Sequence, residues 1–357
     1  MMERSRTRFG ALLLCALVIG ACDDGSGPDL DGRLDPSGAE STLTSVVETL
    51  GAPAEAFSAV ETAAPAISST SAALAPSGGG LMPSMSRVRT LPSEPSAAIF
   101  PSNYLGRTFV WDTQNDEYVV DQGLTGAPAN GVRLIYYGID PVTDRPIEPL
   151  VELGRVDLTD EGSASSWRLG IEVVNTAGDA PITHVDYFID ASWTDDGNTS
   201  TVRVQAEGFV SDGERQLDID LDRTLSYTQS SSTFGVLMDD ALSFAGEDAS
   251  VQFVADGSLS LDTEQPATLD VTMTIAGEGE TAVLDAHIVA EDLSGTVTFP
   301  SSVIEIGGTT AQPVFTKSDG SPLDAADVQA LRAIWEALED FMAFTDRVFS
   351  PFDATTD

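Results

Sequence analysis

The chain contains 357 residues, of which 57 are acidic and 17 are basic, and its formal net charge at pH 7 is −40. Such an acidic surface repels nucleic acid and anionic headgroups, which argues against binding to either through a basic patch. The two cysteines, Cys15 and Cys22, lie close to the start of the chain. The rest of the sequence therefore offers no disulfide, no thiolate nucleophile and no cysteine-based zinc site.

Residues 1–21 have the pattern of a secretory signal peptide. Three arginines precede a short apolar run at residues 11–19, and this run is too short to span a bilayer. The next stretch, Ile19-Gly20-Ala21-Cys22, resembles the lipobox of bacterial lipoproteins, in which the signal is cut before a cysteine that becomes lipidated. This resemblance implies that Cys22 is the lipidation site. An ordinary signal peptide with an incidental cysteine is the alternative.

Lipidation at Cys22 implies an exported protein that is lipid-anchored to a bacterial membrane, either in the periplasm or at the cell surface. The sequence does not distinguish the inner from the outer membrane. Cleavage before Cys22 would leave about 336 residues and would remove three arginines and Glu3, so the net charge would move from −40 to −42. This surface favours divalent cations and cationic partners.

Three segments follow the signal peptide. Residues 22–38 are rich in Asp, Gly, Pro and Ser, which predicts a flexible tether with a reach of roughly 20–25 Å. Residues 39–63 predict an amphipathic helical segment, because apolar residues between Leu43 and Leu50 follow the i, i+3, i+4, i+7 spacing. Residues 64–98 are rich in Ser, Ala, Pro and Gly and predict a linker.

Residues 99–316 predict an antiparallel β domain. Around Leu217, Ile219 and Leu221, apolar residues alternate with aspartates in a two-residue period. One apolar and one polar face per strand favours an antiparallel sheet, since parallel strands are usually apolar on both faces. Turn signals such as Asp212-Gly213 separate the strands and predict hairpins.

Residues 317–357 predict a C-terminal covering helix and tail. Ser321 suits the N-cap, Pro322 the first helical position and Asp324 the third. The helix carries a wide apolar stripe, which includes Leu331 and Trp335.

The predicted fold is therefore mainly β: a large antiparallel sheet, curved or partly barrel-like, covered by an N-terminal and a C-terminal amphipathic helix. A signal peptide, a tether and a helix-covered curved sheet together resemble the open-barrel lipid carriers of bacterial envelopes, the Lol-type and mycobacterial-type lipoproteins. The resemblance is one of architecture and implies that the protein carries a lipid.

The two histidines are the first candidates for chemistry. His184 shares a strand face with Asp186, and His287 shares one with Asp285. Two imidazoles and two carboxylates would suit zinc if the strands were neighbours. A solvated face is the alternative, and we expect no metal and no cofactor.

Other catalytic patterns are weak. Gly162-Ser163-Ala164-Ser165 lacks the second glycine of a hydrolase elbow, and there is no phosphate-binding glycine loop or dinucleotide fingerprint. Asp112, Gln114 and Asp116 are spaced like the start of a calcium loop, but Glu117 stands where glycine is needed. We therefore expect no catalytic residues and no enzyme.

Three further features have a structural and a functional interpretation. Asp218, Asp220 and Asp222 line one side of a strand, where solvation or cation binding would relieve their repulsion. Asn198-Thr199-Ser200 matches a glycosylation sequon or is a hairpin tip. Aromatic residues gather in the first strands, either as core or as a ligand-facing surface; they are Phe109, Trp111, Tyr118, Tyr136 and Tyr137.

The sequence thus predicts a membrane-anchored lipoprotein that binds a lipid or other hydrophobic ligand without catalysis. Its expected partners are the membrane, through Cys22, and a hydrophobic ligand or an envelope protein, but not nucleic acid. The alternative is a structural or interaction lipoprotein of the cell envelope with an acidic, cation-tolerant surface. The sequence does not identify the ligand-binding residues, and Trp335 and Phe341 are the first to mutate.

Overall fold

A computed structural model describes most of the chain from residue 37 onward. The described residues are 37–67, 98–140, 143, 145–163, 166–260, 266–277, 279–300, 302–318 and 323–349. The predicted signal peptide, Cys22, most of the tether and most of the linker lie outside these residues, as do Ser321 and Pro322.

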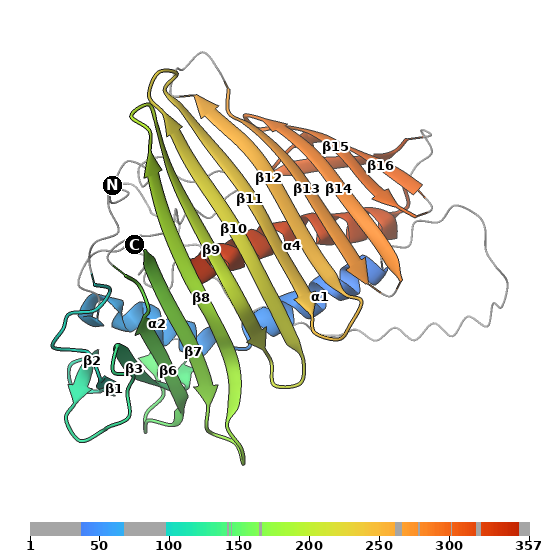
Figure 1. Cartoon of the computed structure of the whole chain (residues 1–357). Coiled ribbons are helices and arrows are strands. Elements are labelled where there is room, and N and C mark those ends of the chain that lie inside the picture. Colours follow the sequence, from blue (N-terminus) through green and yellow to red (C-terminus); the bar gives the residue numbers. More distant parts are fainter. Residues whose placement is uncertain are drawn as a thin grey trace, which may run out of the picture.

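One large sheet dominates the fold and confirms the mainly β prediction (Figure 1). Its fifteen strands follow the order β17-β16-β15-β14-β13-β12-β11-β10-β9-β8-β7-β6-β3-β1-β2. From β6 to β17 every strand pairs antiparallel with its neighbour in the chain, as expected for successive hairpins. The sheet is nevertheless mixed, because β3 returns beside β1 instead of β2 and pairs with it in parallel.

The strands of the large sheet have the following bounds: β1 Arg107–Asp112, β2 Glu117–Asp121, β3 Gly131–Tyr137, β6 Glu152–Asp160, β7 Trp167–Asn175, β8 Ile182–Asp195, β9 Thr199–Ser211, β10 Gln216–Thr228, β11 Thr233–Phe244, β12 Ser250–Ser260, β13 Thr268–Gly277, β14 Glu280–Val289, β15 Asp292–Phe299, β16 Ser302–Thr309 and β17 Gln312–Lys317. A separate two-stranded sheet joins β4 Ile139–Asp140 to β5 Arg145–Pro146.

The sheet is open, so the barrel-like part of the prediction is not realised in the described residues. The end strands, β2 and β17, each pair on one side only. Closure needs the first and last strands to meet, and here the order ends at β17 on one side and at the short β1–β2 hairpin on the other.

The two faces of the sheet differ sharply in polarity. We call the face that carries Leu217, Ile219 and Leu221 of β10 the inner face, and these three residues are almost completely buried. The alternating Asp218, Asp220 and Asp222 lie on the outer face and are half-buried or exposed. The two-residue period of the sequence therefore places the apolar side chains on one face and the aspartates on the other, as the pleat of a strand requires.

Three described helices have the bounds α1 Ser37–Gly51, α2 Ala54–Ile67 and α4 Ala325–Phe349. The turn at Ala52 and Pro53 separates α1 from α2, because proline cannot donate the backbone hydrogen bond that a continuous helix needs. Asp324 caps α4: its carboxylate accepts the backbone N–H of Asp327 at 2.8 Å. The predicted third-position role of Asp324 was wrong, since the described helix begins one residue after it.

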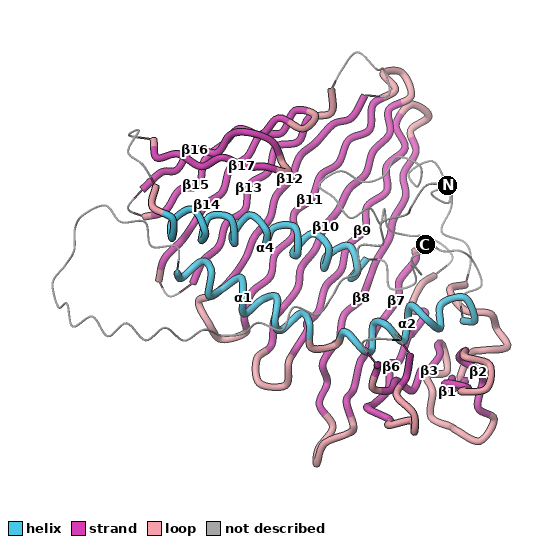
Figure 2. The backbone as a smooth tube through the Cα atoms, turned by 180° about the vertical axis from the view of Figure 1, so that it is seen from behind, coloured by secondary structure: helices cyan, strands magenta, loops and turns pink. Residues whose placement is uncertain are grey.

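The helices lie on the inner face and cross the strands (Figure 2). Helix α1 contacts β9, β10, β13 and β14, and α4 runs beside α1 with contacts to β9 and β17. Helix α2 packs on β2, β3 and β6. Figures 1 and 2 show that the β8–β9 and β10–β11 hairpins extend beyond α4, and we call this the far end of the inner face.

Candidate functional site

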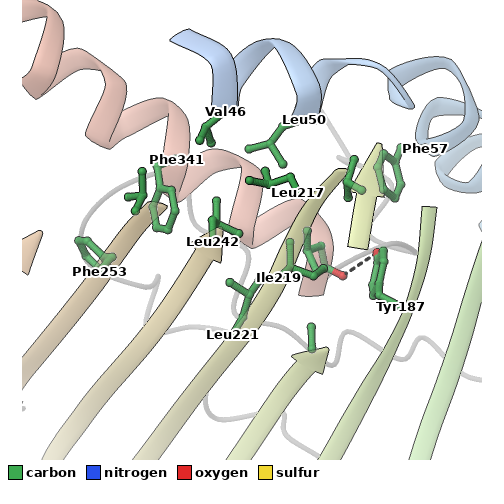
Figure 3. Close-up of a cluster of buried hydrophobic side chains, with 14 of the residues drawn as sticks. Val46, Leu50, Phe57, Tyr187, Leu217, Ile219, Leu221, Leu242, Phe253 and Phe341 are labelled. Carbon is green, nitrogen blue, oxygen red and sulfur yellow. Dashed lines mark hydrogen bonds between the residues drawn. The ribbon is translucent and has the colours of Figure 1, made fainter. Parts of the chain in front are cut away.

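The space between the helices and the inner face holds an apolar cluster (Figure 3). The ring of Phe341 on α4 lies 5.6 Å from the ring of Phe253 on β12. At the end of α4, the carbonyl of Val348 accepts a 3.2 Å hydrogen bond from the buried hydroxyl of Tyr187 on β8. Complete burial raises the pKa of Tyr187, so this hydroxyl stays protonated and able to donate.

This part of the interior is filled. Leu217, Phe253 and Met273 on three different strands each expose 0 % of their surface. A side chain beside an empty space large enough for water would keep some accessible surface, so the helices pack closely on these positions. A ligand of lipid size would need the helices to move.

An ion pair interrupts the apolar inner face. Arg223 of β10 and Asp240 of β11 occupy inner-face positions, and their side chains are 7 % and 0 % exposed. Arg223 donates to one carboxylate oxygen of Asp240 from Nη2 at 3.0 Å and from Nε at 3.3 Å. Of the four buried charged residues in the described part of the chain, Arg223 and Asp240 share the inner face, Asp157 lies on the outer face with Arg133, and Asp327 lies on α4.

The register places this pair at the margin of α4. Asp240 lies directly opposite Phe253, the residue that contacts Phe341 of the helix. Arg223 lies opposite Met238 and Val204, one inner-face position closer to the far end. The pair therefore marks the boundary between the helix-packed region and the far end.

The far end is rich in aromatic residues. Tyr227 and Phe234 stack with ring centres 4.7 Å apart. Trp193 of β8 lies opposite Val202, which in turn lies opposite Leu225 of β10. The indole Nε1 of Trp193 is buried and finds no acceptor among the described residues. The same holds for the indole Nε1 of Trp335, a residue of α4 that is 4 % exposed.

Sequence reasoning missed the ion pair although a signal was present. In β10, Arg223 occupies the next position on the face that carries Leu217, Ile219 and Leu221. In β11, Asp240 stands between Met238 and Leu242 in the same period. A charged residue at a position where the two-residue period places apolar side chains indicates a buried polar group.

The two histidines do not form one site. His184 lies on β8 and His287 on β14, six strands apart in the sheet, which is roughly 29 Å at the usual strand spacing. His184 Nδ1 lies 2.7 Å from the carbonyl of Ser211. No group of three or more histidine, cysteine or carboxylate side chains among the described residues is arranged to hold a metal ion.

His287 lies in a row of residues that includes a carboxylate and a hydroxyl, but the contacts do not form a hydrolytic triad. Its Nδ1 lies 2.6 Å from Asp270 on the next strand, and Asp285 instead accepts from Thr272. Ser294 donates to the backbone carbonyl of His287 at 3.4 Å and not to its ring. The histidine and aspartate side chains are half or more exposed, so no apolar pocket encloses them.

The remaining sequence candidates have structural roles. Asp112 accepts hydrogen bonds from Gln114 N–H and from the Asn115 amide, which lower its pKa and stabilise the β1–β2 turn. Ser163 shares a 2.7 Å hydrogen bond with Ser166 in another turn. The side chain of Asn198 accepts the Ser230 N–H between two hairpin tips.

The aromatic cluster of the first strands is core. All five of its members are buried; they are Phe109, Trp111, Tyr118, Tyr136 and Tyr137. Burial raises the pKa of Tyr136 to about 12, and the hydroxyl of Tyr118 donates to the carbonyl of Ile135. These residues join α2 to the sheet edge and offer no open surface for a ligand.

Comparisons with protein-family models, curated proteins and solved structures find no match to this chain. Within the described residues, no helix has the length and apolar character needed to cross a bilayer.

Proposed function

We propose that this protein is a membrane-tethered, non-enzymatic binding protein that receives a lipid or other hydrophobic ligand on the inner face of its sheet. The observation that carries the proposal is the apolar inner face with its far end beyond α4 and the buried Arg223–Asp240 ion pair between the two regions. Ligand sites combine apolar walls with a few buried polar groups in this way.

The size of the face supports a ligand of lipid dimensions. Strands β8 to β11 contain 14, 13, 13 and 12 residues, so the inner face extends roughly 40 Å along the strands. Two helices that lie side by side across the strands occupy about 20 Å of this length. Leu225 and Phe234 at the far end are 6 % and 8 % exposed, so entry of a ligand there, like entry beneath α4, would require the groups that cover the inner face to move.

The anchor belongs to the same proposal. Lipidation at Cys22 would hold the domain close to a membrane, on the periplasmic side or at the cell surface, where apolar ligands are found. The tether would let the far end approach the bilayer. In this proposal the acidic outer face stays in water, because it repels anionic headgroups.

A structural or interaction lipoprotein is the second candidate. The observation that favours it is the filled interior around Phe253, because a scaffold needs no room for a ligand. Its outer face would then bind envelope components or cations.

The test is to express residues 23–357, incubate the protein with vesicles of bacterial envelope lipids, re-isolate it and measure its mass under native conditions. We expect a stoichiometric lipid adduct. Leu225→Asn on the inner face should lose the adduct, whereas Leu237→Asn, at an exposed position on the outer face, should retain it. A lipid-free mass for the wild-type protein after incubation would refute the carrier and leave the scaffold.

A further inference from the structure

We propose that the outer face of β8, β9 and β10 binds an arginine side chain of a basic protein partner, whose guanidinium stacks on the ring of Phe209 and pairs with the carboxylates around it. This inference goes beyond the proposed function, because that proposal places its ligand on the inner face and leaves the outer face in water. No described helix lies over the outer face of these three strands (Figure 1).

Phe209 is an aromatic residue on a face that is otherwise mostly polar. It lies on β9, directly opposite Asp186 of β8 and Asp218 of β10, and it is partly exposed. The neighbouring outer-face residue on β9 is Glu207, which is exposed. Phe209 makes neither a ring–ring nor a cation–π contact with another described residue. Its ring is therefore accessible in part and lies among three carboxylates.

These carboxylates lack a positive partner within the described part of the chain. Asp186 and Glu207 are exposed and form no ion pair with another described residue. Glu207 also lies directly opposite Asp220 of β10, and like charges in this position destabilise a sheet. A positive group supplied by a partner would relieve that repulsion.

The same face already contains one arrangement of the proposed kind. The guanidinium carbon of Arg168 lies 4.3 Å from the centre of the Phe188 ring. Two carboxylates flank this guanidinium, Asp190 at 3.3 Å and Glu161 at 3.9 Å. Phe209 has the ring and the carboxylates of this arrangement, and the arginine is the part that a partner would bring.

Charge determines the kind of partner. With a net charge of −40, the chain repels nucleic acid, anionic headgroups and a second copy of itself, and it attracts a basic protein. Arginine suits the site better than lysine does, because its planar guanidinium stacks on an aromatic ring while its N–H groups donate to carboxylates. An ammonium group is more strongly hydrated and loses more on leaving water.

The experiment titrates the full chain, extracted in a non-ionic detergent, with two fluorescently labelled peptides. One peptide consists of Gly-Ser-Arg repeats, and the other has lysine in place of every arginine. Since the two peptides carry the same charge, the general attraction to an acidic protein is equal for both. We expect the arginine peptide to bind about two- to fivefold more tightly at about 0.15 M salt, the size of one exposed cation–π contact.

The decisive variant is Phe209→Leu, which keeps an apolar side chain and removes the ring. It should bind the two peptides equally, whereas Phe209→Tyr should keep the preference for arginine. Leu237→Ala is the matched control, because it truncates an exposed apolar residue of the outer face on β11, and it should keep the preference. Glu207→Gln should weaken binding of the arginine peptide more than Glu305→Gln does, since Glu305 is an exposed outer-face residue of the distant strand β16.

Each outcome decides for or against the inference. Equal binding of the two peptides by the wild type, or an unchanged preference in Phe209→Leu, would overturn it. If Phe209→Leu does not fold, the comparison of Glu207→Gln with Glu305→Gln decides, and equal effects of these two would contradict the inference. A wild-type dimer in sedimentation that dissociates in Phe209→Leu would assign the face to a second copy of the chain instead. No result here depends on a hydrophobic ligand, so the lipid-adduct test of the proposed function fails or succeeds separately.

Discussion

Arg223 and Asp240 share a face with residues that are otherwise apolar, which makes the energetics of the pair testable apart from any ligand. Loss of one member takes a close opposite charge away from the other in a buried setting, whereas loss of both removes the two buried charges together. We expect Arg223→Met alone to lower the free energy of unfolding by about 3–5 kcal/mol and the double variant with Asp240→Leu to recover most of this loss. Urea denaturation of both variants measures the difference.

The exposed pair of Arg203 and Asp222 serves as the reference for this experiment. Because the Arg203 side chain is half exposed, removing it should change the free energy of unfolding by about 0–1 kcal/mol. Equal effects of Arg223→Met and Arg203→Met would show that the buried pair has no special energetic role.

Asp212 gives a prediction about pH. Partial burial alone would raise its pKa, but the backbone N–H groups of Arg215 and Glu214 and the charge of Arg215 lower it below the usual value. Its oxygen also accepts a 3.4 Å hydrogen bond from Thr49 of α1, which connects the helix to the β9–β10 hairpin. A lowered pKa means that the ionised form stabilises the folded state at neutral pH.

This stabilisation is present above the unfolded-state pKa of about 3.9 and is lost as the pH falls through the lower value of the folded state. Asp212→Asn removes it at every pH. The folded-state and unfolded-state pKa values of Asp212 both lie below 5. The difference in unfolding free energy between wild type and variant should therefore shrink as the pH falls from about 5 through these values. A difference that is the same at pH 7 and in acid would contradict the role of the carboxylate.

At the scale of the single element, the edge strand β17 carries two residues that oppose pairing with another chain. Pro313 cannot donate a backbone hydrogen bond, and Lys317 is the only lysine of the sequence. The neighbouring Val314 is 56 % exposed, so apolar surface is present at this edge. We expect Pro313→Val with Lys317→Val to form dimers or larger species by light scattering.

The control for the edge is Thr298→Val on β15, a strand that is paired on both sides. It adds a comparable apolar side chain on the exposed outer face and should stay monodisperse to the same extent as the wild type. If the Thr298→Val control associates, or if the double variant of β17 does not, then Pro313 and Lys317 do not protect β17 from pairing with another chain.

Strands with a clear two-residue hydrophobic period could be predicted from the sequence. A strand pairing that depends on where a loop brings the chain back could not. The alternation around Leu217 predicts that this segment is a strand, which of its faces is buried and that it pairs antiparallel, because each of these depends on local spacing. The parallel pairing of β3 with β1 depends on where a loop returns, which no local pattern encodes. The start of α4 was missed for another reason: Ser321 and Asp324 are both good caps, and Asp324 is the one that accepts the N–H of Asp327.

The site was predictable only in part for the same reason. An apolar face under amphipathic helices follows from periodicity, but the meeting of Arg223 with Asp240 needs the register of β10 against β11. The histidine hypothesis failed on sheet order, since β8 and β14 are far apart. Residues that act together across strands become visible only when the register is known.

At the scale of the whole molecule, charge repulsion is distributed over the outer face. The register places Glu207 opposite Asp220, Asp222 opposite Asp239 and Asp256 opposite Asp270. Directly opposed like charges destabilise a sheet, and here they occur on a chain with a net charge of −40. Two of the three pairs have a neighbouring basic group, Arg203 at Asp222 and His287 at Asp270.

Salt should therefore stabilise this protein. At about 0.1 M ionic strength the Debye length is about 10 Å, longer than the spacing of opposed carboxylates, whereas at 1 M it falls to about 3 Å. We expect the melting temperature to rise steadily between these concentrations of sodium chloride. Asp256→Thr should raise the free energy of unfolding by about 0.2–1 kcal/mol at low salt and by less at high salt, since it removes one repelling pair. An equal gain at both concentrations would assign the effect to β-propensity instead of charge, because propensity does not depend on ionic strength.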